Sequence, residues 1–576
     1  MKDNKFEDIY SLSPMQEGML FHSLLSDSDA YFEQMALTFK GSLDLPAFEK
    51  CFNLIIKRHS IFRSVFIHEG VNKPKQVVLK ERSIKVAYDD LSSQPPGVQN
   101  EVISTYKAQD KMKAFNLSKD LLMRLAVFRT GQDEYKVIWS FHHILMDGWS
   151  LGTVLNELFD LYGKIRNRED LALEKPAKFS SYISWLRRQD QQEAQLFWDD
   201  YLRNYHQTAN LPRRNASLVL PGYERKEKVF KLGIDLTEKL NGLAKQCKVT
   251  LNVIIQAVWG LILQKYNDST DVVFGTIVSG RPSEVPNVEQ IVGLFINAVP
   301  VRVKTYSGQS FLELVKQLQE QAIKSGPFGY ISLADIQAGK ETGNQLINHM
   351  VVFENYPLDE SVQSGDGIDQ FGISLTEVDA FDRTNYDFNL LIGPGQNLII
   401  KMVFNERRYT AEAIHDVFSH LKAVINTIVH FPGILVDEID MMSAEEKSKL
   451  IGISSSPETS YPKSSTLTSL FEEQVRKAPS RTAVVYGERK ITYSQLNGMA
   501  NQVARSLRRQ GVQRDQVVGI LTERSAEMIV SILGVLKAGA AYLPIDPDYP
   551  EERISYMLED SGAGTLIVLN PEDVPA

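Results

Sequence analysis

The stretch that begins at residue 135 restricts what this chain can fold into more than any other part of its sequence. Residues 135–141 read YKVIWSF, a run rich in β-branched and aromatic side chains that predicts a buried strand. The polar loop HHILMDG follows at 142–148, and Ser150 can then cap a helix whose apolar side chains at 151–162 share one face. The order strand, polar loop, helix indicates an α/β protein that carries its chemistry on the loop.

Spacing alone leaves three interpretations of this loop open. Two adjacent histidines at the end of a strand can simply be packed or solvated. A metal site would use imidazole and carboxylate ligands, but no further ligand stands at a recognisable spacing, and neighbouring side chains of an extended segment point to opposite faces. In the third interpretation one histidine acts as a general base or orienting group, the other supports it, and Asp147 holds the loop.

The composition of the 576 residues excludes several classes of protein. With 43% hydrophobic and 23% charged residues, the chain can bury several sizeable cores. Lys and Arg number 63 against 72 Asp and Glu, without a basic stripe, so no nucleic-acid partner is expected. No secretory signal opens the chain, and no apolar run approaches the ~18 to 20 residues that span a membrane. The only two cysteines, Cys51 and Cys247, suit a reducing cytoplasm.

Local signals predict further elements along the chain. Ser13, Pro14 and Gln16 are typical of a helix that starts with a capping box. A change to a composition rich in Ser, Pro and charge at 441–465 predicts a linker, after which a new globular segment begins. The other expected elements are helices at 46–57, after Thr250, at 493–509 and at 525–538, and strands at 271–279, 291–303 and in TAVVYG at 482–487.

HHILMDG resembles the HHxxxDG signature of the condensation domains of nonribosomal peptide synthetases, which acyltransferases like chloramphenicol acetyltransferase share in a looser form. Further stretches resemble motifs of condensation domains and occur in the expected order. They are LSPMQEGMLFHSLL near the start, RHSIFR at 58–63, VSGRP at 278–282, IVGLFINAVPVR at 291–302 and VFENYP at 352–357. The resemblance therefore extends over most of the first 440 residues.

The resemblance implies an α/β fold of two chloramphenicol acetyltransferase-like lobes, which form a V-shaped pseudo-dimer with a central tunnel. We expect the N-lobe at 8–178 and the C-lobe at 179–440. Upstream and downstream carrier domains would insert their 4'-phosphopantetheine arms from opposite ends. The upstream arm presents a peptidyl or aminoacyl thioester, and the amine of the downstream aminoacyl thioester attacks it. No metal and no intrinsically bound cofactor are expected.

The resemblance also implies roles for individual residues. His143 is expected to contact the attacking amine, either as a base or as a hydrogen-bond acceptor, and Gly148 to leave room for an arm. His142 is expected to hold the loop, and Asp147 to form a structural ion pair with Arg281. Tunnel or lobe contacts are expected from Arg58, His59, Arg63, Trp149, Ser279 and Asn297.

The last part of the chain carries a second resemblance. ITYSQLN at 491–497 and LKAGAAYLPIDPDYP at 536–550 resemble the first two motifs of an amino-acid adenylation domain. The phosphate-binding loop, the amino-acid pocket and the later lysine of that family do not occur before Ala576. We therefore expect 466–576 to be a truncated α/β adenylation subdomain that adenylates nothing, and the chain to be a segment of a larger synthetase.

Two other functions are weighed against condensation. Epimerisation domains share the HHxxxDG loop, but they normally follow a carrier domain, whereas an adenylation segment follows here. A catalytically idle docking platform is disfavoured by the intact His143 and Gly148. Heterocyclisation domains replace the loop with an aspartate-based motif, which argues against them.

Two finer expectations concern partners and stereochemistry. Because Met1 lies just before LSPMQEGMLFHSLL, residues 1–25 are expected to contain a segment that docks an upstream synthetase subunit and merges into the condensation domain. SPMQEGMLFHSLL and FHHILMDGWS resemble condensation domains that take D-configured donors, so a D-donor and an L-acceptor are expected. The adenylation domain is a partner in cis, and the expected location is a bacterial cytoplasm without membrane attachment.

Overall fold

The computed structural model describes most of the chain, in two compact units that are treated separately. The units are Met1–Leu450 and Ile451–Ala576. The described residues are 5–25, 31–171, 175–213, 222–340, 343–354, 372–381, 386–454 and 461–569. Parts of the expected docking segment (1–4), of VFENYP (355–357) and of the expected linker (455–460) lie outside these ranges.

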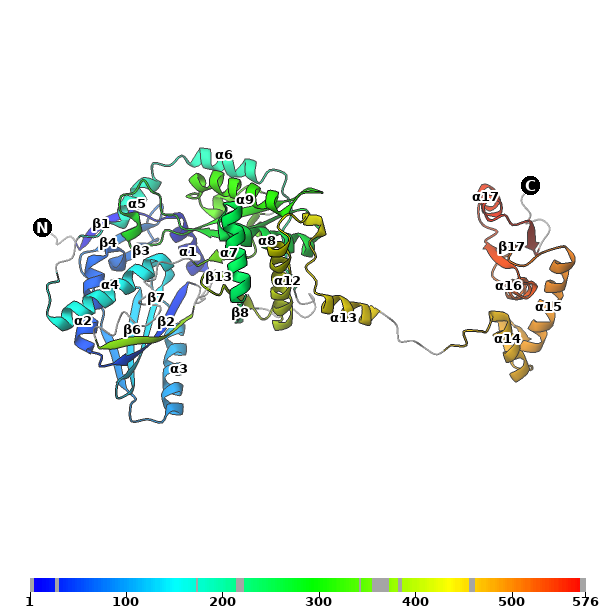
Figure 1. The fold of residues 1–576 in the computed structure, drawn as a ribbon, viewed down its shortest axis with the longest axis horizontal. Helices are drawn as coiled ribbons and strands as arrows, with labels where there is room; N and C mark the ends of the chain where they lie inside the picture. The colour runs from blue at the N-terminus through cyan, green and yellow to red at the C-terminus, as the bar shows by residue number, and fades with distance from the viewer. Residues whose placement is uncertain are drawn as a thin grey trace. The chain divides into compact units, whose positions relative to one another are not determined.

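The N-lobe is built on a five-stranded sheet with helices on both faces (Figure 1). Phe39 on one face contacts Phe48 and Phe159, and Phe128 on the other face contacts Tyr106. Because successive side chains of a strand point to opposite faces, these contacts show that both faces of the sheet are buried. In spatial order the strands are β12 (Ile373–Phe381), β2 (Phe32–Gly41), β7 (Glu134–His142), β6 (Met123–Gly131) and β5 (Val86–Asp90). The helices are α2 (Leu45–Arg58) and α4 (Gly148–Asn167) on the first face and α3 (Pro96–Met112) on the second.

The start of the chain is part of the folded N-lobe. The backbone N–H of Ser13 donates to Gln16 Oε1 (2.9 Å), and that of Gln16 donates to Ser13 Oγ (3.4 Å). The predicted capping box is therefore confirmed. The elements are β1 (Phe6–Ser11), which pairs with β4 (Lys75–Leu79) beside β3 (Ser64–Ile67), and the helix α1 (Pro14–Leu25).

The C-lobe is built on a six-stranded sheet, and one of its helices is buried on every side over 253–264. That helix, α8 (Leu251–Asn267), is capped by Thr250 as predicted and stacks Trp259 on Phe388 of the sheet. The strands in spatial order are β10 (Asn297–Lys304), β9 (Asp271–Val278), β11 (Met350–Phe353), β13 (Phe388–Gly393), β14 (Ile399–Asn405) and β8 (Arg225–Lys231). The other helices of this core are α7 (Ile234–Cys247), α9 (Phe311–Ser325) and α12 (Ala411–His430).

Two segments join the lobes more closely than a simple division at residue 178 suggests. The strand β12 lies between C-lobe strands in sequence, yet it pairs antiparallel with β2, with Val378 opposite Leu37. The helix α5 (Phe179–Leu186) buries Phe179 and Tyr182 in the same core as the N-lobe helices. The predicted two-lobed α/β fold is thus confirmed, with elements of the C-terminal half completing the N-lobe.

Two predicted element starts are wrong. Ser150 is not the N-cap of α4: the cap is Asp147, whose carboxylate accepts from the backbone N–H of Ser150 (2.8 Å), so the helix starts at Gly148. The strand predicted over 291–303 starts only at Asn297. The residues before it form an irregular segment that lies against the loop, because their backbone groups bond to N-lobe side chains instead of to a neighbouring strand.

A helix occupies the first part of the expected linker. This helix, α13 (Ala444–Ser454), contacts α12, because both carboxylate oxygens of Glu446 lie within 3.0 Å of His420 Nε2.

The second unit is a smaller α/β fold. Its strands are β15 (Thr482–Tyr486) with β16 (Arg489–Thr492), and the parallel β18 (Ala541–Ile545), β17 (Val517–Leu521) and β19 (Thr565–Val568). Its helices are α14 (Leu467–Lys477), α15 (Tyr493–Arg509), α16 (Ala526–Ala538) and α17 (Glu551–Ser561).

None of the helices in the described ranges is by itself long and apolar enough to cross a membrane. The helices α7 and α8 reach that threshold only as a pair, and the pair is bent by 104°. The residues that make α8 apolar are buried in the C-lobe core.

Candidate active site

The loop at the end of β7 is held in place by backbone hydrogen bonds on both sides. The N–H of His142 donates to the carbonyl of Leu122 (3.0 Å), and the N–H of His143 donates to the carbonyl of Tyr31 (2.9 Å). A single tight turn over His143–Leu145 then leads to α4. The two histidines therefore sit at a fixed point between a sheet and a helix.

His142 supports the loop as a buried, neutral side chain. Its Nδ1 accepts from the backbone N–H of Ile144 (3.1 Å), and its Nε2 lies 3.4 Å from Ser23 Oγ. Burial, with a smaller contribution from His143, lowers the pKa of His142 to about 3. The imidazole consequently stays neutral near pH 7, which fits the predicted role of holding the loop.

A backbone contact of His143 selects the tautomer of its neutral ring. Its Nδ1 lies 2.8 Å from the carbonyl oxygen of Met146. Because a carbonyl only accepts, Nδ1 must carry the hydrogen of this bond, and in the neutral ring Nε2 is then a free lone pair. Glu33 Oε1 lies 4.0 Å from this Nε2, and the side chain of His143 is 25% exposed. This exposure sets it apart from His142 and leaves Nε2 able to accept a proton.

Asp147 is fully buried and bonded through both of its carboxylate oxygens. Oδ1 accepts from the backbone N–H of Ser150 (2.8 Å) and from Arg281 Nη2 (3.2 Å). Oδ2 accepts from the backbone N–H of Phe295 (3.0 Å). The side-chain exposures are 0% for Asp147 and 4% for Arg281. The ion pair expected from the sequence is therefore present, and it connects the N-lobe loop to the C-lobe.

Arg281 connects the loop to the irregular segment before β10. Its Nη1 donates to the carbonyls of Val288 (2.6 Å) and Ile291 (3.0 Å), and its Nη2 donates to Ser150 Oγ (2.9 Å). Burial lowers the pKa of Arg281, and the carboxylate of Asp147 counteracts this shift. Arg281 therefore ties the loop to this segment through its guanidinium.

A cavity of about 1330 Å³ opens beside His143 and is lined by both lobes. Its charged members include Glu17 and Lys73 from the N-lobe and Asp335 from the C-lobe. Burial raises the pKa of Glu17, and Lys73 opposes that shift. Other lining residues include Met15, Met19, His22, Tyr31, His68, Asn297, Ser332, Ile347, Met350 and Tyr386. No group of three or more His, Cys, Asp or Glu within the described ranges is placed to hold a metal ion.

The remaining predicted site residues fall into two groups. Asn297 lines the cavity of His143, Ser279 lines a second cavity in the C-lobe, and Trp149 Nε1 donates across the lobes to the carbonyl of Glu289 (3.1 Å). Gly148 is the first residue of α4 and is half-buried. The second group, Arg58, His59 and Arg63, lines neither cavity.

Arg58, His59 and Arg63 have described partners in the N-lobe. Arg58 and His59 contact the two carboxylate oxygens of Glu157 (3.2 and 2.7 Å). Arg63 bonds Glu7 (2.8 Å) and carbonyls that include that of Ile56 (3.1 Å). These contacts hold the C-terminal end of α2 in place and give the three residues no described tunnel or lobe contact.

Sequence reasoning missed Glu17, Lys73 and Glu33. Glu17 lies within LSPMQEGMLFHSLL, a stretch that resembles a motif of the family, and this was a signal that it could lie near the site. Glu33 and Lys73 carry no such signal, because their approach to the cavity and to His143 depends on strand pairing between distant segments.

The structure has two α/β lobes joined by a crossing strand, with a histidine loop bonded to both. This architecture agrees with the chloramphenicol acetyltransferase-like fold that the sequence resemblance implies. Residues 6–451 match the family model for the condensation domain, and residues 471–576 match that for AMP-binding enzymes. The chain therefore belongs to the condensation-domain family of nonribosomal peptide synthetases and continues into the start of an AMP-binding domain.

Curated relatives share this organisation over much longer chains. Gramicidin S synthase 2 of Brevibacillus brevis is 42% identical over 559 residues, which are 97% of this chain and 12% of that protein. Bacitracin synthase 3 of Bacillus licheniformis is 41% identical over 574 residues, or 100% of this chain and 9% of that protein. The chain thus spans about an eighth or less of the length of these relatives.

Solved structures share the fold. A four-domain nonribosomal peptide synthetase bound to AMP and glycine superimposes with a TM-score of 0.76 at 20% identity, over 97% of this chain and 43% of that one. The first condensation domain of the calcium-dependent antibiotic synthetase, in complex with a substrate analogue, gives a TM-score of 0.62 at 16% identity. That alignment covers 76% of this chain and 100% of the other.

Proposed function

We propose that this chain forms an amide bond between two carrier-bound thioesters, with His143 contacting the attacking amine. The observation that carries the proposal is the 2.8 Å contact of His143 Nδ1 with the carbonyl oxygen of Met146. In the neutral ring this contact places the hydrogen on Nδ1 and leaves Nε2 as an acceptor beside a cavity of about 1330 Å³. A cavity of this size, lined by both lobes, has room for an aminoacyl group and the arm that carries it.

The reaction requires that the amine and the donor carbonyl are aligned and that a proton passes from the amine to the departing sulfur. The nitrogen of the acceptor amine bonds the donor carbonyl carbon, the carbon–sulfur bond breaks, and the upstream thiol leaves. A thioester is already activated, so holding amine and carbonyl in contact supplies much of the acceleration. An α-amine with a pKa near ~8 is partly neutral at pH 7. His143 Nε2 orients this neutral amine, accepts the proton that it loses, and delivers a proton to the departing sulfur.

The other predicted residues keep this arrangement in place. His142 and the pair of Asp147 with Arg281 hold the loop, and Gly148 leaves its neighbourhood open to an arm. The carrier domains supply 4'-phosphopantetheine as part of the substrate, so no cofactor is resident in the chain. Glu17 and Lys73 place opposite charges in the same cavity, which favours a polar acceptor group there.

The proposal extends to the wider assembly. Residues 1–25 would receive an upstream synthetase subunit, and the adenylation domain would act in cis from the residues after 466. The two free cysteines, Cys51 and Cys247, suit action in a reducing cytoplasm.

The test is amide formation from two loaded carriers. A D-configured and an L-configured donor, each on an upstream carrier, are mixed with the chain and an L-aminoacyl carrier, and the product is identified by mass. The proposal expects an amide, formed faster from the D-donor. An L-preference would overturn only the stereochemical part. Epimerised donor without amide, or no reaction beyond that of the carriers alone, would contradict the condensation function.

A further inference from the structure

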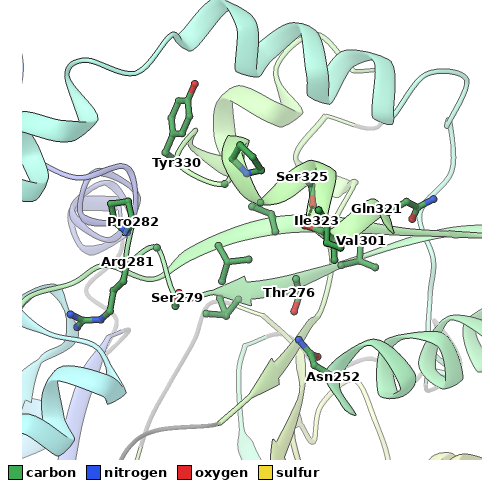
Figure 2. A pocket seen from close by; sticks show the side chains of 18 of the residues that line it. Asn252, Thr276, Ser279, Arg281, Pro282, Val301, Gln321, Ile323, Ser325 and Tyr330 are labelled. Carbon is green, nitrogen blue, oxygen red and sulfur yellow. Dashed lines mark hydrogen bonds between the residues drawn. The ribbon is translucent and has the colours of Figure 1, made fainter. Parts of the chain in front are cut away.

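The turn His143–Leu145 is supported from two directions, and Arg281 provides only one of them. Figure 2 shows Arg281 extending away from the C-lobe cavity that Ser279 lines, towards the N-lobe. There it bonds Asp147 (3.2 Å) and Ser150 (2.9 Å), which both come after the turn. None of its hydrogen bonds to described residues reaches the turn itself. The support of the turn must therefore come from elsewhere.

Gln16 of α1 contacts the turn directly. Its Nε2 donates to the carbonyl of Ile144, the central residue of the turn (3.2 Å). The N–H of Ile144 donates to His142 Nδ1 (3.1 Å), so both polar backbone groups of this residue have partners. Gln16 is 0% exposed, which keeps water from replacing it at the Ile144 carbonyl.

The neighbours of the Gln16 carboxamide admit only one orientation of it. Its Oε1 accepts from the backbone N–H of Ser13 (2.9 Å), and its Nε2 donates to Gln76 Oε1 (3.1 Å) as well as to Ile144. An amide oxygen only accepts and an amide nitrogen only donates, so a flipped side chain would lose all three bonds. The donor is thus held against the turn.

Gln76 of β4 connects this side chain to the three-stranded sheet. Its Nε2 donates to Tyr10 Oη on β1 (2.9 Å) and to Ser64 Oγ on β3 (2.8 Å). Gln76 is also 0% exposed. A buried polar network whose members are satisfied is rigid, so the sheet, α1 and the turn form one connected unit.

The turn decides where the carbonyl of Met146 lies. The N–H of Met146 donates to the carbonyl of His143 (3.2 Å), and the Met146 carbonyl lies 2.8 Å from His143 Nδ1. A neutral imidazole can carry its hydrogen on either nitrogen, and the bond that one nitrogen makes decides between them. A change in the turn would therefore change the tautomer of His143.

We propose that Gln16 is a positioning residue, which holds the turn through Ile144 so that the Met146 carbonyl keeps the hydrogen of His143 on Nδ1. Gln16 lines neither cavity, so it acts through the loop and not on the substrate. The inference rests on the proposed function in taking His143 Nε2 as the acceptor for the amine. It adds that a residue 127 positions before His143 in the chain keeps that nitrogen free of hydrogen.

The test observes the tautomer directly. The full chain is labelled with ¹⁵N-histidine, and the ring nitrogens are recorded by NMR at a pH of about 8, where an ordinary histidine is neutral. The His143 signals are those among the ten histidines that disappear in His143→Ala. We expect hydrogen on Nδ1 in the wild type and a mixture of tautomers in Gln16→Met, which has a similar shape but makes none of the three bonds. The single-turnover rate of amide formation should fall by about tenfold, as expected for the loss of one orienting hydrogen bond.

A second variant and a matched control separate positioning from stability. Gln16→Asn keeps the carboxamide but is one methylene shorter, so it should shift the tautomer too. Gln264→Met is the control, because Gln264 is also a buried carboxamide, whose Nε2 donates to the carbonyls of Thr270 (2.7 Å) and Val303 (3.1 Å) in the C-lobe. It should lower stability and keep the wild-type ring signals and rate.

The outcomes distinguish this inference from the proposed function. Wild-type ring signals in a folded Gln16 variant, an equal change in Gln264→Met, or hydrogen on Nε2 in the wild type overturns the inference even where amide forms. Failure of both Gln16 variants to fold would make Gln16 a folding residue and overturn it as well. A wild type with the expected tautomer that forms no amide would overturn the proposed function alone.

Discussion

At the scale of single residues, two adjacent histidines are given opposite properties by their surroundings. His142 is buried and accepts a backbone N–H, so it cannot take up a proton near pH 7. His143 has its Nδ1–H bonded to a carbonyl and its Nε2 beside a cavity. His142 can therefore hold the loop in place, while His143 is free to contact the amine in the proposed reaction.

The ion pair of Asp147 and Arg281 is expected to contribute strongly to stability. Arg281→Met leaves the carboxylate of Asp147 buried without its counter-charge, which should lower the free energy of unfolding by about 3–5 kcal/mol. The measurement is urea denaturation followed by tryptophan fluorescence. Lys164→Ala, which breaks the surface pair with Asp160, is the control and should cost less than about 1 kcal/mol. A similar small loss for Arg281→Met would show that the buried pair is not structural.

Buried histidines predict a pH dependence of stability. Burial lowers the pKa values of His142 and His349 to about 3, against 6.5 for an ordinary histidine. Below pH ~6.5 the unfolded chain therefore binds more protons than the folded one, so stability falls as the pH falls towards about 3. Each histidine contributes a slope of up to about 1.4 kcal/mol per pH unit.

Urea denaturation at pH 7, 6 and 5 checks this slope. His349→Gln removes one of the two most strongly shifted histidines and should make the slope between pH 6 and 5 shallower. A stability that stays constant over this interval would mean that the buried histidines are protonated in the folded protein.

At the scale of elements, the segment between β9 and β10 depends on Gly280. This glycine has φ +61°, and a Cβ at this position would lie 1.8 Å from the carbonyl oxygen of Phe295. Gly280→Ala must therefore displace the segment that bonds Asp147 and Ser150. It is expected to lower stability by about 2 kcal/mol or more and to slow amide formation as well.

Thermal denaturation and the carrier assay together test this substitution. Gly308→Ala is a matched control, because Gly308 also has a positive φ (+77°), but a Cβ at that position would meet no atom within 4 Å beyond its chain neighbours. Only backbone strain should affect the control, so amide formation should stay near the wild-type rate. Equal effects of both substitutions on amide formation would remove the special role of the β9–β10 segment.

Elements with local signals could be predicted, and elements that depend on distant partners could not. The capping box of Ser13 and Gln16 and the cap of Thr250 follow from neighbours in sequence. Ser150 is a plausible cap from the sequence, yet Asp147 is the N-cap because its carboxylate accepts from the backbone N–H of Ser150. The pairing of β12 with β2 involves segments more than 300 residues apart and leaves no periodic pattern in either one.

The features of the candidate site that depend on distant contacts could likewise not be predicted from local sequence. The residues themselves indicate the loop, and the resemblance to a family implies the Asp147–Arg281 pair. The tautomer of His143 depends on the position of the Met146 carbonyl, which the sequence does not give. Arg58, His59 and Arg63 belong to a motif of that family, and the partners described for them lie in the N-lobe.

At the scale of the whole molecule, two units are expected to fold separately. The described cores of the first unit contain no residue after Met441, and those of the second begin at Phe471. A chain ending at residue 454 should therefore fold and form amides at the full-length rate. Circular dichroism and the carrier assay check this. Loss of folding in the shortened chain would show that the second unit is required for the first.

The central claim is that His143 contacts the amine during amide formation. The most direct measurement is the single-turnover rate of amide formation from two loaded carriers, comparing the wild type with His143→Ala. Because His143 is partly exposed, the variant should remain folded while the rate falls by about 100-fold or more. A folded His143→Ala variant that forms amide at the wild-type rate would contradict the account.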